Sequence, residues 1–196
     1  GMPFTRSADG FEAHMGTNHL GHFALTCRLA DRIAERVVSV VSSNYAFGTL
    51  RLDDLNWYAR RYSAMAAYAQ SKLAIMLFVD ELARRGVRAH AANPGQSATD
   101  ITRYSTGVIK RIVDRPPAAL TWTSQSLDQA ARSTIQAVHT DMPSGTYFAP
   151  RFKQWGQPRV TRPLAKARDP VHAARLWELS AQLTGCDWPA DSTFNA

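Results

Sequence analysis

The sequence predicts an α/β fold in which short parallel strands alternate with longer helices. Three observations support this class. Apolar or β-branched runs occur at 37–41, 87–92 and 145–149, amphipathic stretches separate them, and the 196 residues contain no internal repeat or low-complexity tract. Parallel strands need crossover connections of a dozen or more residues, which are usually helices. We therefore expect one domain over residues 1–196, with a parallel sheet and flanking helices.

The first predicted helix covers residues 9–35. Asp9 is a candidate for its N-terminal cap, because Glu12 follows in capping-box register and apolar residues then recur every three or four positions. Gly16 and Gly21 lie inside this helix. Since glycine lowers helix stability, these two positions predict the close approach of another backbone.

The remaining elements follow from β-branched runs, helical periodicity and cap residues. We predict strands at residues 37–41, 87–92 and 145–149, and helices at residues 63–85, 101–115, 124–139 and 170–183. The last helix has the clearest ends: Asp169 suits its cap, Pro170 its first position, and Gly185 its C-terminus. The intervening residues 150–168 are rich in basic residues and proline, and we predict that they form a loop.

Composition excludes several classes of protein. With 45% apolar and 20% charged residues, the chain is long enough for a hydrophobic core. It has no apolar run of the length that a membrane-spanning helix needs, and its start does not resemble a signal peptide. Cys27 and Cys186 match no metal or disulfide spacing, which indicates free thiols in a reducing compartment. We expect a cytoplasmic protein without a membrane span.

The net charge of +7 is concentrated in one segment. Residues 151–168 contain six basic residues and no acidic residue, which leaves 17 basic against 16 acidic residues elsewhere. A basic stretch is compatible with a nucleic-acid partner, a phosphate-bearing ligand, a subunit contact or a solvated loop. No nucleic-acid-binding motif is present, so the sequence favours a solvated basic loop and no nucleic acid.

The most informative pair is Tyr68 and Lys72, in the stretch Tyr68-Ala69-Gln70-Ser71-Lys72. Residues four apart on a helix share a face, and an ammonium group beside a phenol favours the phenolate. A tyrosine whose pKa is lowered in this way can act as a general acid and base near neutral pH. Taken alone, the spacing is equally typical of a surface lysine packed on a half-buried tyrosine.

Polar or turn-forming residues follow two of the predicted strands: Ser42 and Ser43 after the first, and Asn93-Pro94-Gly95 after the second. The carboxyl ends of parallel strands share one edge of the sheet, where open α/β folds bind ligands. The helix that carries Tyr68 and Lys72 can flank the same crevice. This context favours a catalytic role for the pair.

The combined motifs resemble the short-chain dehydrogenase/reductase superfamily, and in particular its retinol dehydrogenase and protochlorophyllide reductase branch. The resemblance extends in order over residues 9–185. The matching stretches are Asp9-Gly10-Phe11-Glu12, Asn18-His19-Leu20-Gly21-His22-Phe23, residues 36–43, Asp53-Asp54-Leu55-Asn56, residues 68–74, Pro94-Gly95 with Thr99, Gly145-Thr146-Tyr147-Phe148 and residues 176–180. It implies the C-terminal part of a doubly wound, Rossmann-like sheet.

The same resemblance implies an oxidoreductase that interconverts an alcohol and a carbonyl with NADP or NAD. Tyr68 would exchange a proton with the substrate oxygen, and Lys72 would hold the ribose hydroxyls of the cofactor. Ser43 would donate a hydrogen bond to the substrate oxygen. Asn18 would support a proton relay beside Lys72.

Further implied roles concern the cofactor and the substrate. Pro94, Gly95 and Thr99 would line the nicotinamide end of the cofactor. Residues 101–123 would form a substrate lid. The substrate would be a small hydrophobic alcohol or carbonyl compound.

One part of the family pattern is missing. No two of the 11 glycines are closer than five residues apart, so the glycine-rich turn that binds the dinucleotide phosphates is absent from this sequence. The resemblance therefore implies that an N-terminal dinucleotide-binding half, roughly 60–90 residues, is lacking. An internal gene start, cleavage of a longer chain and a natural remnant are the explanations that stay open.

Without that half, the strand at 37–41 would have an open edge, which is a template for pairing with another chain. We therefore expect a homo-oligomer or self-association through this edge, and we expect the isolated chain to be inactive. The alternative is a non-catalytic remnant that acts as an oligomerisation or binding module. His14, His19 and His22 do not share one helical face, so we interpret them as structural and expect no metal site.

Overall fold

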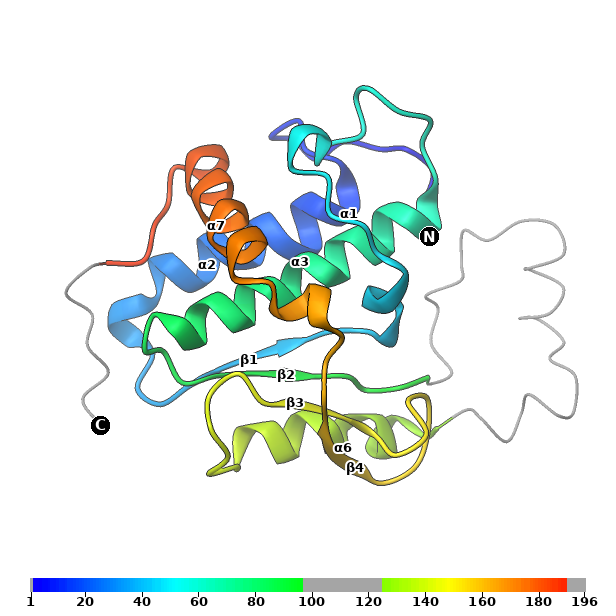
Figure 1. Ribbon diagram of the computed structural model, residues 1–196, viewed down its shortest axis with the longest axis vertical. Helices are drawn as coiled ribbons and strands as arrows, with labels where there is room; N and C mark the ends of the chain where they lie inside the picture. The colour runs from blue at the N-terminus through cyan, green and yellow to red at the C-terminus, as the bar shows by residue number, and fades with distance from the viewer. Residues whose placement is uncertain (1, 97–124, 190–196) are drawn as a thin grey trace, which may run out of the picture.

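The computed structural model describes residues 2–96 and 125–189, which form a four-stranded sheet with helices on both faces (Figure 1). Its strands follow in the order β1 (Val37–Val40), β2 (Ala89–Ala92), β3 (Tyr147–Pro150) and β4 (Pro158–Thr161). The first three strands are parallel, and β4 is antiparallel to β3. The predicted α/β class is confirmed.

The helices form two unequal layers. One face of the sheet is covered by α1 (Ala13–Met15), the π-helix η1 (Gly16–Leu20), α2 (Gly21–Arg28), α3 (Ala64–Arg84) and α7 (Pro170–Thr184) (Figure 1). The other face is covered by α6 (Leu127–Val138) (Figure 1). Short 3-10 helices lie at η2 (Ala30–Arg32), η3 (Ser43–Phe47), η4 (Leu52–Asp54) and η6 (Ala165–Arg168). Because α3 is long and largely buried, it supplies side chains to both ends of the sheet.

The start of α3 and both ends of α7 lie where the sequence predicts them. The Ser63 hydroxyl accepts from the Ala66 amide at the start of α3. At α7, the Asp169 carboxylate accepts from the first-turn amides, Pro170 occupies the first turn, and Gly185 ends the helix with φ 64°. These signals work because each involves residues only a few positions apart.

The prediction of one regular helix over residues 9–35 is wrong. The cap is Glu12 instead of Asp9, because its carboxylate accepts from the amides of His14 and Met15 at 3.0 and 2.8 Å. The chain then widens into the π-helix η1 before α2 begins. A Cβ added at Gly21 would lie 3.1 Å from the Gly16 carbonyl oxygen, so glycine permits this wide turn.

Residues 150–168 are not only a loop, so that prediction is also corrected. They contain β4, whose Val160 pairs with Phe148 of β3, and the short helix η6. Pro158 is the first residue of β4. Proline is tolerated at the start of an edge strand because it removes no hydrogen bond needed inside the sheet. The result is a β3–β4 hairpin whose tip is residues 151–157.

An aromatic cluster joins three of the helices. Phe23 of α2 lies with its ring centroid 4.9 Å from that of Trp177 of α7, and Phe78 of α3 stacks on the same tryptophan at 5.7 Å. Beside them, the buried His19 ring lies 2.8 Å from the Ser180 hydroxyl. Burial lowers the pKa of His19 to about 3, so this histidine is neutral and structural.

His14 and His22, the other two histidines of the N-terminal helical segment, also have partners within the protein. His14 Nδ1 lies 2.8 Å from the buried Glu12 carboxylate, and His22 Nδ1 lies 2.8 Å from the Thr17 carbonyl oxygen. In residues 2–96 and 125–189, no three His, Cys, Asp or Glu side chains converge to hold a metal ion. Across the same two ranges, no helix has the length and apolar content that a bilayer crossing requires.

One edge of the sheet lies along β1. Val37 and Val41 donate their amides to Arg88 and Ala92 of the β2 segment. Because successive amides of a strand point to opposite sides, those of Val38 and Val40 point away from β2. Within the described part of the chain, no strand pairs with this side, and the Val40 side chain is 48% exposed.

Candidate functional site

The carboxyl ends of β1 and β2 open into a cavity of about 370 Å³, which we call the strand-end cavity. Its walls come from the segments after β1 and β2, from α3 and from the tip of the β3–β4 hairpin. The lining residues are Val41, Ser42, Ser43, Asn44, Tyr68, Asn93, Pro94, Gly95, Gln96 and Gln154. The structure thus brings four of the predicted site residues together: Ser43, Tyr68, Pro94 and Gly95.

Tyr68 lies at this cavity beside two serines. The side chain that acts on the pKa of its phenol is Ser42, the residue before the predicted Ser43. Burial raises the pKa of Tyr68 above its usual value of 10, and the hydrogen bond from Ser42 acts in the opposite direction. The expectation of a lowered Tyr68 pKa is therefore wrong for this structure, and the phenol is protonated at neutral pH.

Ser43 has a different partner. The side-chain amide of Gln154, at the tip of the β3–β4 hairpin, donates to the Ser43 hydroxyl oxygen at 2.9 Å. The two neighbouring serines therefore diverge: Ser42 is paired with the phenol and Ser43 with a carboxamide. The alternation of side chains along a strand does not predict which serine has which partner. The strand has ended at this point, because Ser42 caps the short helix η3 and Ser43 is its first residue.

The Asn93-Pro94-Gly95 turn forms the floor of the cavity. The Asn93 carboxamide oxygen accepts from the Gly95 amide at 3.1 Å, and Gly95 has φ 78°. A Cβ at Gly95 would collide with the carbonyl group of Gln154. Glycine is needed here because the hairpin tip packs directly on the turn.

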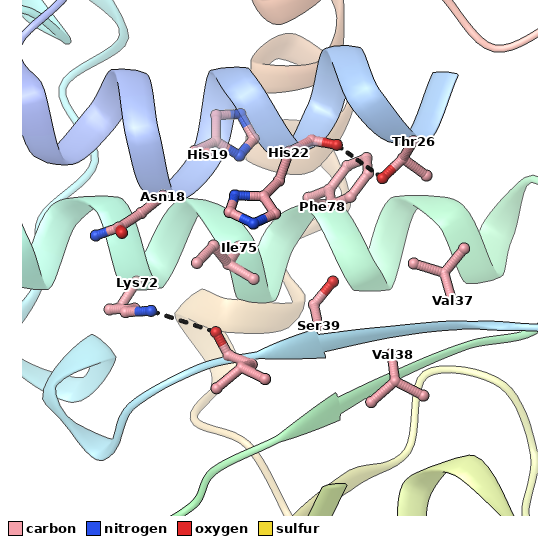
Figure 2. Close-up of a pocket in the computed structure, with 11 residues that line it drawn as sticks. Asn18, His19, His22, Thr26, Val37, Val38, Ser39, Lys72, Ile75 and Phe78 are labelled. Atoms are coloured by element: carbon pink, nitrogen blue, oxygen red, sulfur yellow. Dashed lines mark hydrogen bonds between the residues drawn. The ribbon is translucent and has the colours of Figure 1, made fainter. Parts of the chain in front are cut away.

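Lys72 and Asn18 line a second cavity of about 260 Å³, which lies along β1 and which we call the β1-edge cavity (Figure 2). The Lys72 ammonium donates to the Val40 carbonyl oxygen at 3.3 Å (Figure 2). It lies 5.7 Å from the centroid of the Tyr68 ring. Burial lowers the pKa of Lys72 to about 8.

Asn18 lies in the π-helix and contacts α3. Its side-chain amide donates to the Ser71 hydroxyl at 2.9 Å, and Ser71 in turn donates to the Tyr68 carbonyl oxygen at 2.8 Å. Asn18 is thereby fixed next to the helical turn that connects Tyr68 and Lys72. The predicted constellation is thus divided between two cavities that share this turn.

Some predicted positions cannot be placed, and some site residues were not predicted. Thr99 and the predicted lid at residues 101–123 lie outside the described residues. No role was predicted for Ser42, Asn93 or Gln154. The Asn-Pro-Gly turn is a signal that could have identified Asn93, because asparagine side chains often bond to the backbone two residues on. Nothing local to Gln154 indicates its contact with Ser43, 111 positions away in sequence.

Comparisons with known proteins indicate the family that this chain resembles. Human retinol dehydrogenase 13 is 37% identical over 96% of this chain, and mouse retinol dehydrogenase 12 is 36% identical over 95% of it. A crystal structure of an uncharacterized protein from Mycobacterium paratuberculosis matches with 39% identity and a TM-score of 0.78. The resemblance to short-chain dehydrogenases/reductases of the retinol dehydrogenase branch is confirmed.

These matches are partial in one direction. The chain spans 58% of the length of the two retinol dehydrogenases. The match to the mycobacterial structure includes 96% of this chain and 64% of the mycobacterial chain. No model of a known protein family matches the sequence. The short-chain dehydrogenase/reductase relationship therefore concerns the segment that carries Tyr68 and Lys72.

The residues present fit one end of a nicotinamide dinucleotide. The strand-end cavity offers hydroxyl and amide groups together with Pro94 and Gly95, which suits the nicotinamide and its ribose. The phosphates of such a cofactor require a glycine-rich turn, which the spacing of the 11 glycines excludes from these 196 residues. The described residues thus offer groups for the nicotinamide end of such a cofactor and not for its phosphates.

Proposed function

We propose that this chain carries the proton-transfer site of an NAD(P)-dependent oxidoreductase that interconverts an alcohol and a carbonyl. One observation supports this most directly: Tyr68 lines the strand-end cavity together with Ser43, Pro94 and Gly95. The relatives named retinol dehydrogenases support the same class of reaction. They also support a small hydrophobic alcohol or carbonyl compound as the substrate.

In carbonyl reduction, Tyr68 donates its proton to the substrate oxygen while the carbonyl carbon is reduced. A nicotinamide cofactor would supply the hydride when bound in its reduced form, NADPH or NADH. The raised pKa of Tyr68 keeps the proton available at neutral pH, and Ser42 orients the hydroxyl. In alcohol oxidation the same phenolate oxygen takes the proton back.

The other predicted residues have supporting roles in this proposal. Pro94 and Gly95 would line the nicotinamide end, and Ser43 would donate to the substrate oxygen. Lys72 would reach the ribose hydroxyls after its ammonium leaves the Val40 carbonyl, which it binds at 3.3 Å. Asn18 would hold α3 in register through Ser71. With no glycine-rich turn, the 196 residues alone should bind the cofactor weakly and turn over slowly.

The test is reduction of all-trans-retinal followed by nicotinamide absorbance, with cofactor binding measured in parallel by nicotinamide fluorescence. In a chain with a dinucleotide-binding half restored, we expect Tyr68→Phe to lower turnover by roughly 10²- to 10⁴-fold and to leave cofactor affinity nearly unchanged. Tyr58→Phe is the matched control, because its exposed hydroxyl donates to the Gly10 carbonyl instead. Turnover that survives in Tyr68→Phe would disprove the assignment.

The open β1 edge supports a second candidate function, a module for self-association. Val40 is 48% exposed, and within the described residues only β2 pairs with β1. Unpaired edge strands pair readily with a second copy. If the wild-type chain neither binds NADPH or NADH nor reduces retinal, but forms dimers, this second function is favoured.

A further inference from the structure

The β3–β4 hairpin is bound to the floor of the strand-end cavity through its main chain. Asn93 donates its side-chain amide to the Lys153 carbonyl at 3.0 Å. The Gln154 carbonyl accepts from the Gln96 amide at 2.8 Å and from the Gln125 side chain at 3.0 Å. These three hydrogen bonds fix the backbone of residues 153–154. The Gln154 side chain is therefore delivered into the cavity from a defined anchor.

That side chain determines how the Ser43 hydroxyl is used. The Gln154 amide donates to the Ser43 oxygen at 2.9 Å, so this oxygen is an acceptor. A hydroxyl group has one hydrogen to donate. Within residues 2–96 and 125–189, the Ser43 side chain makes one hydrogen bond, in which it accepts from Gln154. The hydrogen of the Ser43 hydroxyl is therefore free to be donated to a ligand. A hydroxyl that accepts a hydrogen bond also becomes a better donor.

We propose that Gln154 is a positioning residue that directs the Ser43 hydrogen toward the oxygen of a bound alcohol or carbonyl compound. This inference rests on the function proposed for the same cavity and deepens it. It assigns the hairpin a role in recognising the ligand, and it gives the ligand two donors, Tyr68 and Ser43. The cavity then selects ligands with an acceptor oxygen over apolar ligands of the same shape.

The test compares acetophenone with α-methylstyrene, which has a CH₂ group in place of the carbonyl oxygen. Binding is measured in a Tyr68→Phe background, so that Tyr68 contributes no hydrogen bond to the ligand oxygen, from chemical shifts in ¹H–¹⁵N spectra, which also report folding. We expect acetophenone to bind roughly three- to tenfold more tightly, the effect of one hydrogen bond. Gln154→Leu and Ser43→Ala should each abolish this preference, and the double variant should lose nothing more.

Gln157→Leu is the matched control for the hairpin. Gln157 lies on the same tip, but its side-chain oxygen accepts from Arg132 at 3.3 Å. It should keep the full preference for acetophenone. In the Tyr68→Phe background, a preference that survives in Gln154→Leu, or a parent chain that binds both ligands equally or neither, would overturn the proposal.

A second variant tests the direction of the hydrogen bond. In Gln154→Glu at pH 7, the carboxylate can only accept, so it takes the Ser43 hydrogen and should abolish the acetophenone preference. Near pH 4, where an ordinary glutamate is largely protonated, the preference should partly return. Gln157→Glu adds the same charge without this effect. A preference in Gln154→Glu that does not change with pH would count against a directing role.

These results are separable from the proposed enzymatic function. If Tyr68→Phe abolishes turnover while Gln154→Leu leaves ligand preference intact, the oxidoreductase proposal stands and the role of Gln154 is wrong. If ligand preference behaves as expected while Tyr68→Phe retains turnover, the role of Gln154 stands as that of a binding determinant and the acid/base assignment is wrong.

Discussion

The two cavities that share the Tyr68–Lys72 turn of α3 differ in how their polar groups are held. In the strand-end cavity, Ser42 lowers the pKa of Tyr68, and Gln154 donates to Ser43 at 2.9 Å. In the β1-edge cavity, the Lys72 ammonium donates to Val40, a carbonyl on the open side of β1. The first cavity is organised by contacts within the chain. The second has a strand edge that can still pair, so its geometry depends on what covers β1.

Tyr68 and Lys72, which their spacing on α3 groups together, line different cavities. Tyr68 and Lys72 lie one helical turn apart, and the ammonium lies 5.7 Å from the ring centroid. Their hydrogen-bond partners nevertheless belong to different cavities. A shared helix face brings two side chains close, but the elements packed against that face decide what each one binds.

The largest expected effect is within the strand-end cavity, between the two serines. Ser42→Ala removes the hydrogen bond to the reacting phenol and should lower turnover by roughly 10- to 100-fold. Ser43→Ala should cost roughly three- to tenfold, mainly in KM, because it weakens ligand binding. The pKa of Tyr68, followed by NMR of its ring carbon, should rise in Ser42→Ala alone, since that hydrogen bond lowers it.

These two variants also serve as controls for each other, because they are neighbours of identical chemistry. A greater loss of turnover in Ser43→Ala than in Ser42→Ala would restore the assignment that the sequence favoured. It would also show that Tyr68 does not depend on Ser42 during the reaction.

An intermediate effect is expected at the β1 edge. The Val40 amide points away from β2, while Val37 and Val41 donate to β2. Val40→Pro therefore removes an edge donor without breaking the existing ladder. We expect self-association, measured by sedimentation velocity, to weaken about tenfold. Val40→Ala shortens the same side chain but keeps the amide, so it should associate as the wild type does; equal association of Val40→Pro would exclude pairing through this edge.

The parts of the fold that the sequence predicted are those that depend on local chemistry. Ser63 and Asp169 cap their helices, and Gly185 ends α7, because each acts within a few residues of itself. The β-branched run before Ser42 predicted β1 because strand preference is also a property of neighbouring residues. Strand β4 was missed because its pairing with β3 requires a hairpin whose tip is stabilised by the distant Asn93 turn.

The candidate site shows the same limit. Tyr68, Ser43, Pro94 and Gly95 do meet at one cavity, because the carboxyl ends of parallel strands share an edge. The choice between Ser42 and Ser43 depends on where β1 turns into η3, which no residue pattern specifies. The role of Gln154 depends on a contact between segments 111 residues apart, so it required the folded chain.

The smallest expected effect tests how well the β1-edge cavity excludes water, through the pH dependence of stability. Burial lowers the pKa of Lys72 to about 8 from an ordinary value of 10.5. Between these pH values the unfolded chain binds a proton that the folded chain does not, so folding becomes more favourable as pH rises. Below pH 8 both states are protonated, and the cost of burying the charge is fully present.

Lys72→Met lacks this titration. Urea unfolding of both proteins from pH 7 to pH 10 should therefore show the wild type gaining stability relative to the variant above pH 8, and a constant difference below it. Arg84→Met, on the same helix but partly exposed, is a control that removes a positive charge without altering the dependence in this range. Parallel curves for wild type and Lys72→Met would mean that water reaches the ammonium, so that the β1-edge cavity is open to solvent.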